Sequence, residues 1–119
     1  MTEERKNVAV EKSKKFAVQI IEFSEKLESE RKYVIARQLL RSGTSIGANI
    51  REAQSSESRA DFIHKMKIAA KEAEETEYWL ELCKGSNNYP RNEMLEIECR
   101  ELLKILGKII ASSKKVIGN

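Results

Sequence analysis

The stretch that decides the fold runs from Phe62 to Cys83 and reads FIHKMKIAAKEAEETEYWLELC. Within it, seven residues recur at alternating intervals of four and three, the spacing that keeps side chains on one side of a helix and forms a seam against other helices. They are Phe62, Met66, Ala69, Ala73, Thr76, Leu80 and Cys83. Ser58, with Asp61 three residues later, has the pattern of a capping box that starts a helix. We therefore predict a helix over residues 58–84 whose seam is buried.

Three other segments show the same helical spacing: residues 8–28, 31–53 and 92–116. Their inward rows are predicted to be Phe16, Ile20, Phe23 and Leu27; Ile35, Leu39, Ile46, Ile50 and Ala53; and Leu95, Cys99, Leu102, Leu106, Ile109 and Val116. Gly85 is predicted to end the third helix as a left-handed cap, and Pro90 cannot continue it. Long helices joined by short loops favour antiparallel neighbours. The sequence thus predicts an all-α fold, an antiparallel up-down-up-down four-helix bundle that forms one domain over residues 1–119.

The composition is that of a water-exposed helical protein, with 34% charged and 40% hydrophobic residues. The apolar runs are only a few residues long, so we expect no membrane span and no signal-peptide core. A cytoplasmic location is therefore expected. Cys83 and Cys99 both fall on apolar rows, which predicts reduced thiols in the core rather than a disulfide.

A polar stripe runs beside the apolar row of the second predicted helix, with members spaced four, three, four and three apart. These are Gln38, Ser42, Ser45, Asn49 and Glu52. Because buried polar groups must find hydrogen-bond partners, the stripe indicates polar contacts that fix the register of two helices, or alternatively a small-ligand or partner site. Residues 42–49, which include Gly43 and Gly47, are poor helix-forming sequence, and small residues within a helix predict a closely packed neighbour at that point.

A few apolar residues point away from the predicted core. Tyr78 and Leu82 project about 160° from Phe62 by helical counting. The apolar arc of residues 8–28 is also wider than a monomeric bundle requires, and Ile21 lies on its outer part. We expect Tyr78, Leu82 and Ile21 to contact another subunit.

The basic residues give the strongest functional hypothesis. The chain has a net charge of +3, and the excess lies on the second and fourth predicted helices. The candidate nucleic-acid-binding residues are Arg37, Arg41, Arg51, Arg100, Lys104, Lys108 and Lys115. Such rows match the charge of a phosphate backbone, although a basic row on an amphipathic helix is also typical of a solvated surface that confers solubility.

No arrangement of residues predicts catalysis. His64 is the only histidine and points outward, so it has no partner for a metal ion. The acidic residues of the third helix alternate with Lys65, Lys67 and Lys71, as on a solvated, salt-bridged face; they are Glu72, Glu74, Glu75 and Glu77. A phosphate-binding glycine loop with its lysine is also absent from the sequence. We expect a protein that is not an enzyme and holds no metal or cofactor.

Residues 38–53, QLLRSGTSIGANIREA, together with SRADF at 58–62 and EYWLEL at 77–82, resemble a known family. It is the bacterial four-helix-bundle family encoded in intervening sequences of 23S ribosomal RNA genes, related to the accessory variability determinant proteins of diversity-generating retroelements. The resemblance spans nearly the whole chain, with Gly47 at a position where many members carry proline. It implies a homopentamer, and the retroelement relatives imply association with RNA or DNA and with a reverse transcriptase. Those relatives are more basic than this chain.

Two functions therefore remain open from the sequence. The first is a non-enzymatic oligomeric scaffold that binds nucleic acid electrostatically. The second is a protein-interaction module that recruits a partner through its outer apolar residues, including Tyr78 and Leu82.

Overall fold

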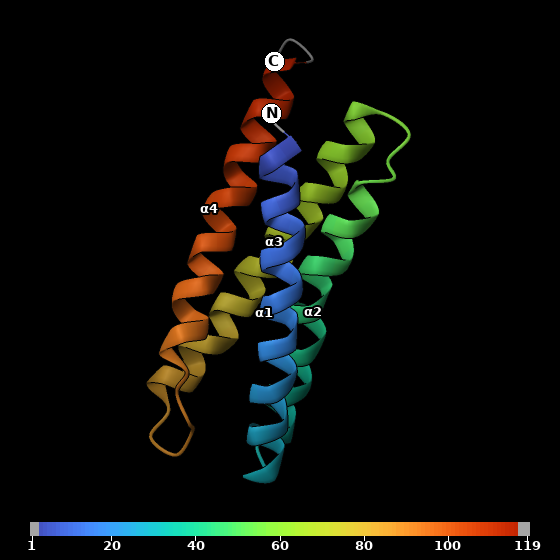
Figure 1. Cartoon of the computed structure of the whole chain (residues 1–119). Coiled ribbons are helices and arrows are strands. Elements are labelled where there is room, and N and C mark those ends of the chain that lie inside the picture. The colour runs from blue at the N-terminus through green and yellow to red at the C-terminus, as the bar shows by residue number, and fades with distance from the viewer. Residues whose placement is uncertain (1–2, 117–119) are drawn as a thin grey trace.

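The computed structural model describes residues 3–116 and confirms the all-α fold: in this part of the chain there are four helices and no strand. They are α1 (Glu3–Ser29), α2 (Tyr33–Ala53), α3 (Arg59–Gly85) and α4 (Glu93–Val116) (Figure 1). Apart from the start of α1, each helix begins and ends close to its predicted limits. The largest difference is at the start of α1, which begins at Glu3 rather than at residue 8.

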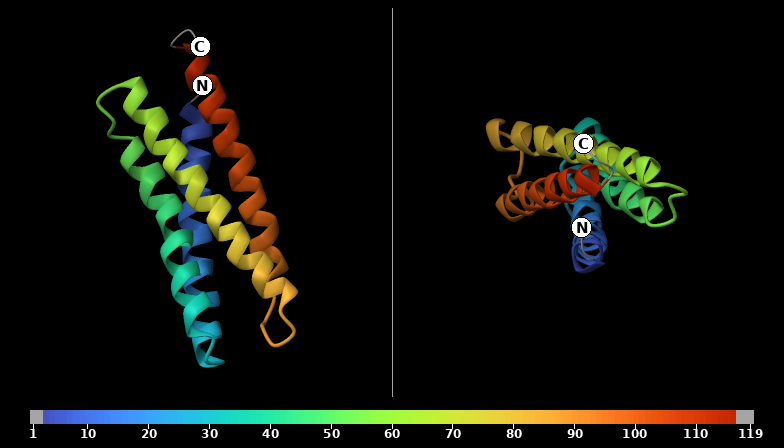
Figure 2. Two further views of the ribbon diagram at one scale, coloured as in Figure 1. Left: turned by 180° about the vertical axis from the view of Figure 1, so that it is seen from behind. Right: turned by 90° about the horizontal axis from the view of Figure 1, so that it is seen from above.

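The helices form an elongated bundle of 49 × 22 × 20 Å. Packing contacts join α1 to α2, α2 to α3, α3 to α4 and α4 to α1. Within the described residues, no contact joins α1 to α3 or α2 to α4, so these are the diagonal pairs. The beginning of α1 and the end of α4 lie at the same end of the bundle, and successive helices run in opposite directions (Figures 1 and 2).

The predicted inward rows form the core. All seven residues of the α3 seam are buried, and Leu80 is typical at 1% exposed. The predicted rows of the other helices are also buried, with two qualifications: Ile35 is only half-buried, and the side chain of Val116 lies outside the described part. Burying a side chain such as Leu, Ile, Phe or Met stabilises the fold by about 1.5–3 kcal/mol. These rows therefore dominate the stability of the bundle.

The prediction for the start of α3 is confirmed, whereas the prediction for its last turn is wrong. Ser58 is the N-cap, and its hydroxyl accepts a hydrogen bond from the backbone N–H of Asp61 at 3.0 Å. The Asp61 carboxylate accepts the return bond from the N–H of Glu57, at 3.3 Å, and not from Ser58 itself. At the other end, the prediction of a left-handed Gly85 is wrong: Gly85 is the last helical residue, and the chain leaves the helix through extended Ser86 (φ −100°, ψ 127°).

The left-handed residue of the described chain is Arg31, with φ of 64°. Backbone N–H groups of Arg31 and Lys32 donate to the carbonyls of Glu28 and Leu27, at 2.9 and 2.8 Å. This pair of bonds is the Schellman motif, which usually places glycine at the left-handed position. The α1–α2 turn therefore holds a side chain in a backbone conformation that glycine adopts at lower cost.

Gly43 and Gly47 lie where α2 passes close to α1, as predicted. A Cβ atom on Gly43 would stand 2.8 Å from two side-chain carbons of Ile20, and one on Gly47 would stand 3.4 Å from the Ser13 carbonyl oxygen. The cost of two helix-interior glycines is thus explained by the close packing of α1 against α2.

Candidate functional site

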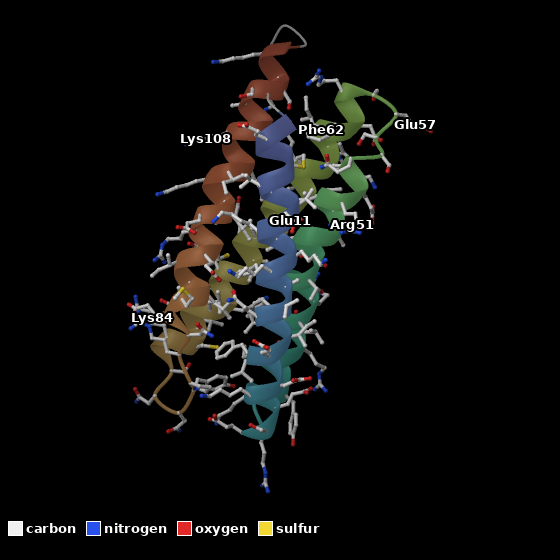
Figure 3. All side chains as sticks on the ribbon, in the orientation of Figure 1. Glu11, Arg51, Glu57, Phe62, Lys84 and Lys108 are labelled. Carbon is white, nitrogen blue, oxygen red and sulfur yellow. The ribbon has the colours of Figure 1, made fainter. Side chains whose placement is uncertain are left out.

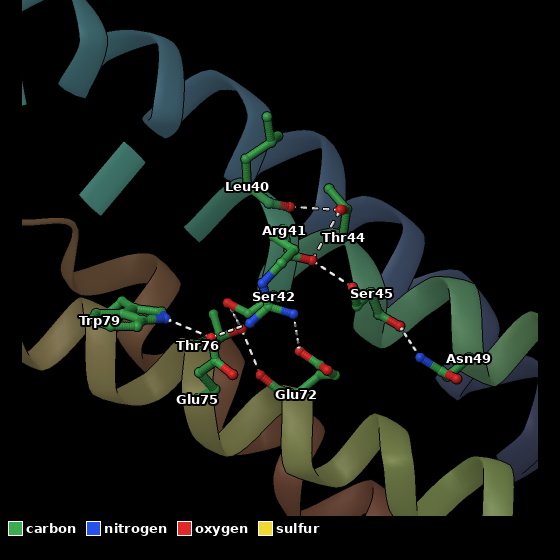
Figure 4. A network of polar contacts seen from close by, with 10 residues as sticks. All are labelled: Leu40, Arg41, Ser42, Thr44, Ser45, Asn49, Glu72, Glu75, Thr76 and Trp79. Atoms are coloured by element: carbon green, nitrogen blue, oxygen red, sulfur yellow. Dashed lines mark hydrogen bonds and ion pairs between the residues drawn. The ribbon is translucent and has the colours of Figure 1, made fainter. Parts of the chain in front are cut away.

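The polar stripe of α2 faces α3 at its centre (Figure 4). Ser42 and Thr76 are both 0% exposed, and a hydrogen bond of 2.9 Å joins their hydroxyl oxygens. The Thr76 hydroxyl also donates to the carbonyl oxygen of Glu72 at 2.7 Å. This part of the stripe therefore joins two helices through side chains buried from the surface, in agreement with the register role predicted from the sequence.

The other members of the stripe behave differently. Ser45 donates to the carbonyl of Arg41 at 2.6 Å, and Asn49 donates to the carbonyl of Ser45 at 2.9 Å, so both side chains bond within their own helix. Glu52 reaches α3 and accepts from Lys65 at 3.0 Å. Ser42 and Glu52 are therefore the members of the stripe whose side chains bond to α3.

Arg41 is engaged by α3. Its guanidinium pairs with Glu72 at 3.3 Å and with Glu75, and the indole N–H of Trp79 donates to the same Glu75 carboxylate at 3.0 Å (Figure 4). The hydrogen bond from Trp79 and then the one from Arg41 lower the pKa of Glu75, while the bond to Glu75 raises the pKa of Arg41. Because two carboxylates compensate its charge, Arg41 contributes less free positive charge than the sequence suggested.

The remaining candidate cations are exposed on two separate helices. Arg37 and Arg51 lie on α2, and four residues on α4 form what we name the α4 basic row: Arg100, Lys104, Lys108 and Lys115. None of these six residues enters an ion pair with a residue whose side chain the structure describes. Because α2 and α4 are diagonal, one subunit does not bring the two sets together; Figure 3 shows Arg51 and Lys108 on opposite sides of α1.

The structure adds three cations that the sequence reasoning did not assign to a site. Lys67 and Lys71 lie one turn apart on the exposed side of α3, and Lys114 lies on the last turn of the neighbouring α4. Interaction with Lys114 of α4, and more weakly with the charge of Lys71, lowers the pKa of Lys67. We call these three residues the lysine cluster. The spacing of Lys67 and Lys71 was visible in the sequence, but Lys114 joins them only because of the way α4 packs.

The outer apolar residues do not form one patch. Tyr78 on α3 is 53% exposed, Leu82 on α3 is half-buried, and Ile21 on α1 is 42% exposed. Because α1 and α3 are diagonal, Ile21 lies on a different side of the bundle from Tyr78. The Tyr78 and Trp79 rings are 5.3 Å apart, so Trp79 supports the tyrosine from the flank.

Both cysteines are free, buried thiols, as predicted. Burial raises the pKa of Cys83 to about 11 and that of Cys99 to about 12. The Cys99 thiol donates to the carbonyl oxygen of Ala73 at 3.3 Å across the α3–α4 seam. These thiols are protonated at neutral pH and are therefore poor nucleophiles and poor metal ligands.

Acidic side chains take structural positions. Glu96 is 6% exposed, and the exposed Arg91 donates to both of its carboxylate oxygens at 3.1 Å, an ion pair that the sequence reasoning missed. His64 is exposed. Within residues 3–116, no three His, Cys, Asp or Glu side chains are grouped as metal ligands, and no helix there has the length and apolarity to cross a bilayer.

Comparison with known proteins agrees with this architecture. Residues 5–108 match the family described as 23S rRNA-intervening sequence protein. A crystal structure of a protein with unknown function from the S23 ribosomal protein family of Bacteroides thetaiotaomicron is 49% identical, with a TM-score of 0.85 over 90% of this chain and 98% of that one. A comparison with curated proteins gives no match. The chain belongs to the 23S rRNA-intervening sequence protein family.

Proposed function

We propose that this protein is a non-enzymatic, homo-oligomeric scaffold of the cytoplasm that binds RNA or DNA electrostatically. The single observation that supports the proposal is the α4 basic row, whose four cations are exposed and form no ion pair with any side chain that the structure describes. By contrast, the exposed Arg41 and Lys12 and the half-buried Lys65 pair with carboxylates of a neighbouring helix. Uncompensated charge in a row is what a phosphate backbone recognises.

The positions of the outer apolar residues support assembly into a closed ring. A head-to-tail ring requires two different contact surfaces on each subunit. Ile21 on α1 and Tyr78 on α3 supply apolar side chains on diagonal helices. A ring of five such subunits is what the family resemblance implies, and it would repeat the α4 basic row five times around one particle. Repetition raises the local positive potential well above that of a chain of net charge +3.

The binding proposal is tested with a fluorescent single-stranded RNA of about 20 nucleotides, long enough to span several phosphate contacts. Arg100→Glu/Lys104→Glu reverses two charges of the α4 basic row and is expected to weaken binding more than tenfold, because each reversal replaces an attraction with a repulsion. Lys15→Glu/Lys26→Glu makes the same change of charge at exposed positions of α1 and serves as the control. Equal affinities for the α4 variant and wild type would refute the binding surface.

The assembly proposal is tested by sedimentation of the wild type and of Ile21→Glu and Tyr78→Glu. Burying a charge in an apolar contact is costly, so each variant is expected to shift the protein from a pentamer to smaller species. Retention of the wild-type mass by both variants would place the contact elsewhere on the bundle. Such a ring would also fit a relation to the accessory variability determinant proteins of diversity-generating retroelements. In that case a reverse transcriptase is the proposed protein partner.

The second candidate function is a protein-interaction module. The observation in its favour is the exposure of Tyr78, since exposed aromatic residues are enriched at the centres of protein interfaces. In this case a specific protein partner remains bound after nuclease treatment and at high salt, and Tyr78→Ser releases it. Loss of the partner on nuclease treatment would instead favour the nucleic-acid scaffold.

A further inference from the structure

An open groove runs along the α1–α2 pair, whose helices pack side by side (Figures 1 and 2). Its volume is about 350 Å³, and its lining includes Ala17 of α1 and Gly47 and Ala48 of α2. None of these three residues carries more than a methyl group, so the floor leaves room for a side chain from outside. Two exposed cations also line the groove, Lys14 and Arg51, the second of which is labelled in Figure 3. Neither cation forms an ion pair with a side chain that the structure describes.

The groove has two chemically different ends. A Cβ atom on Gly43 would stand 2.8 Å from carbons of Ile20, so this part of α2 crosses close to the middle of α1. Beside this crossing, one turn beyond the residues that line the groove, lie Leu40 of α2 and Ile21 of α1, which are 41% and 42% exposed. Arg51 lies about two turns away from the crossing in the other direction along α2. The groove therefore passes from an apolar end at Leu40 and Ile21 to a cationic end at Arg51.

The outer side of α3 carries side chains in the complementary order. Glu74, Tyr78 and Leu82 follow one another at intervals of four, and we call these three residues the α3 ridge. Glu74 is exposed and forms no ion pair with a described side chain, Tyr78 is 53% exposed, and Leu82 is half-buried. At about 1.5 Å per residue, the ridge spans about 12 Å and the α2 side of the groove, from Leu40 to Arg51, about 16 Å. The ridge is therefore short enough to lie within the groove.

Charge decides how two copies of the chain can meet. A groove packed against a groove would bring the unpaired cations Lys14 and Arg51 of both copies together, and a ridge packed against a ridge would leave both copies of Glu74 without a cation. A ridge packed in a groove instead brings opposite charges together. Within one subunit this contact cannot form, because α3 and α1 are diagonal in the bundle. The complementary surfaces therefore meet between two copies, as a head-to-tail contact that repeats from subunit to subunit.

We infer that the α3 ridge of one copy docks in the α1–α2 groove of the next copy. The ring of Tyr78 covers the small residues of the floor. Glu74 pairs with Arg51 at the cationic end, and Leu82 packs at the apolar end. The inference rests on the homo-oligomer of the proposed function and names the two surfaces that join its subunits. It also assigns Arg51 to the subunit contact rather than to nucleic acid.

The test is sedimentation velocity of the full chain over a series of protein concentrations. Arg51→Glu and Glu74→Arg each place like charges at the contact, whereas the combined variant Arg51→Glu/Glu74→Arg restores an opposite pair. Ala48→Trp fills the groove without changing the charge. The matched controls are Lys104→Glu on α4 and Glu22→Arg on α1, two exposed positions that belong to neither surface. Thermal melts followed by circular dichroism establish that every variant is folded.

The wild type is expected to sediment as a pentamer. Arg51→Glu, Glu74→Arg and Ala48→Trp are each expected to raise the protein concentration needed for assembly more than tenfold, because the first two introduce repulsion and the third blocks the floor. The combined variant is expected to recover most of the assembly that either single reversal loses. This recovery is the result that a purely structural role of either residue would not give. Both controls are expected to assemble like the wild type.

Each other outcome counts against the docking. A wild-type pentamer that Arg51→Glu, Glu74→Arg and Ala48→Trp leave intact overturns it, while the oligomer of the proposed function stands. Dissociation in both single reversals without recovery in the combined variant overturns it as well, and so does equal dissociation in the controls. A wild type that stays monomeric at every concentration overturns the docking together with the homo-oligomeric part of the proposed function, and the RNA titration then decides on nucleic-acid binding alone.

Discussion

The hydroxyl oxygens of Ser42 and Thr76 lie 2.9 Å apart between α2 and α3, and neither side chain is exposed to solvent. This bond places two polar groups opposite each other inside an apolar seam. Sliding α3 by one residue relative to α2 would leave the Ser42 hydroxyl buried without its partner, at a cost of about 1–3 kcal/mol, whereas Thr76 would keep its bond to the Glu72 carbonyl of its own helix. The pair therefore selects one register of the two helices, which in turn fixes the positions of Arg41 and Glu75 (Figure 4).

A double-mutant cycle measures this coupling. Ser42→Ala and Thr76→Val are each expected to lower the free energy of unfolding by about 1–3 kcal/mol, because each leaves the other hydroxyl without its cross-helix partner. The double variant is expected to be about 1 kcal/mol more stable than the sum of the single effects predicts. Urea denaturation of the four proteins gives the four free energies. Additive effects would show that the two hydroxyls do not stabilise each other.

The close approach of α1 and α2 predicts opposite effects for one substitution at two glycines. Gly43→Ala places a methyl group 2.8 Å from carbons of the buried Ile20, and the resulting overpacking is expected to destabilise the fold by about 1–3 kcal/mol. Gly107→Ala meets no neighbouring atom and is expected to stabilise the fold by about 0.5–1 kcal/mol through helix propensity. Thermal melts of both variants provide the comparison. Stabilisation of the fold by Gly43→Ala would contradict the packing described at this crossing.

The left-handed backbone of Arg31 predicts a stabilising substitution. Arg31→Gly is expected to raise the free energy of unfolding by on the order of 1 kcal/mol, because glycine adopts a positive φ without steric cost. Arg59→Gly, at the first residue of α3, is the control and is expected to be neutral or destabilising. Chemical denaturation distinguishes the two. A destabilised Arg31→Gly would mean that the side chain contributes more than the backbone conformation costs.

The raised thiol pKa values predict a loss of stability in alkali. The ordinary pKa of cysteine, 9.0, applies to the unfolded chain, whereas Cys99 in the folded protein has a pKa of about 12. Below pH 9 both states keep the proton and the contribution to stability is constant. Between pH 9 and about 12 the Cys99 thiol loses its proton only in the unfolded chain. The free energy of unfolding therefore falls as the pH rises, by on the order of 1 kcal/mol at pH 10 for this thiol.

Cys99→Ser isolates this effect, since a serine hydroxyl can donate to the Ala73 carbonyl but does not ionise in this range. The measurement is the difference in the free energy of unfolding between wild type and Cys99→Ser, at pH 7.5 and at pH 10. From pH 7.5 to pH 10, the wild type is expected to lose stability relative to Cys99→Ser. The same difference at both values would show that the thiolate is tolerated in the fold.

The buried rows could be predicted from the sequence because helical periodicity is a local property, and in a bundle the side that a helix buries follows from it. The cap at Ser58 is equally local, since the residues that form it lie within four positions of one another. The end of α3 was predicted wrongly because a glycine near a helix terminus need not be the residue that adopts positive φ. In the α1–α2 turn the residue with positive φ is Arg31, and an arginine in a sequence does not predict that conformation.

The candidate site was less predictable because it depends on how the helices are rotated and offset against each other. The sequence assigned Arg41 to the candidate nucleic-acid-binding residues, but the packing of α3 brings Glu72 and Glu75 to its guanidinium. The same kind of information pairs Lys65 of α3 with Glu52 of α2. Contacts between side chains far apart in the sequence cannot be obtained from the periodicity of one helix alone.

The salt dependence of RNA binding by the wild-type protein tests the central claim most directly. The four cations of the α4 basic row predict a slope of log affinity against log salt of about −3 for a single-stranded RNA. Anisotropy titrations from about 50 to 200 mM salt cover the range in which such a slope is measured. A slope close to zero, or no binding at the lowest salt concentration, would contradict the assignment of this bundle as an electrostatic nucleic-acid scaffold.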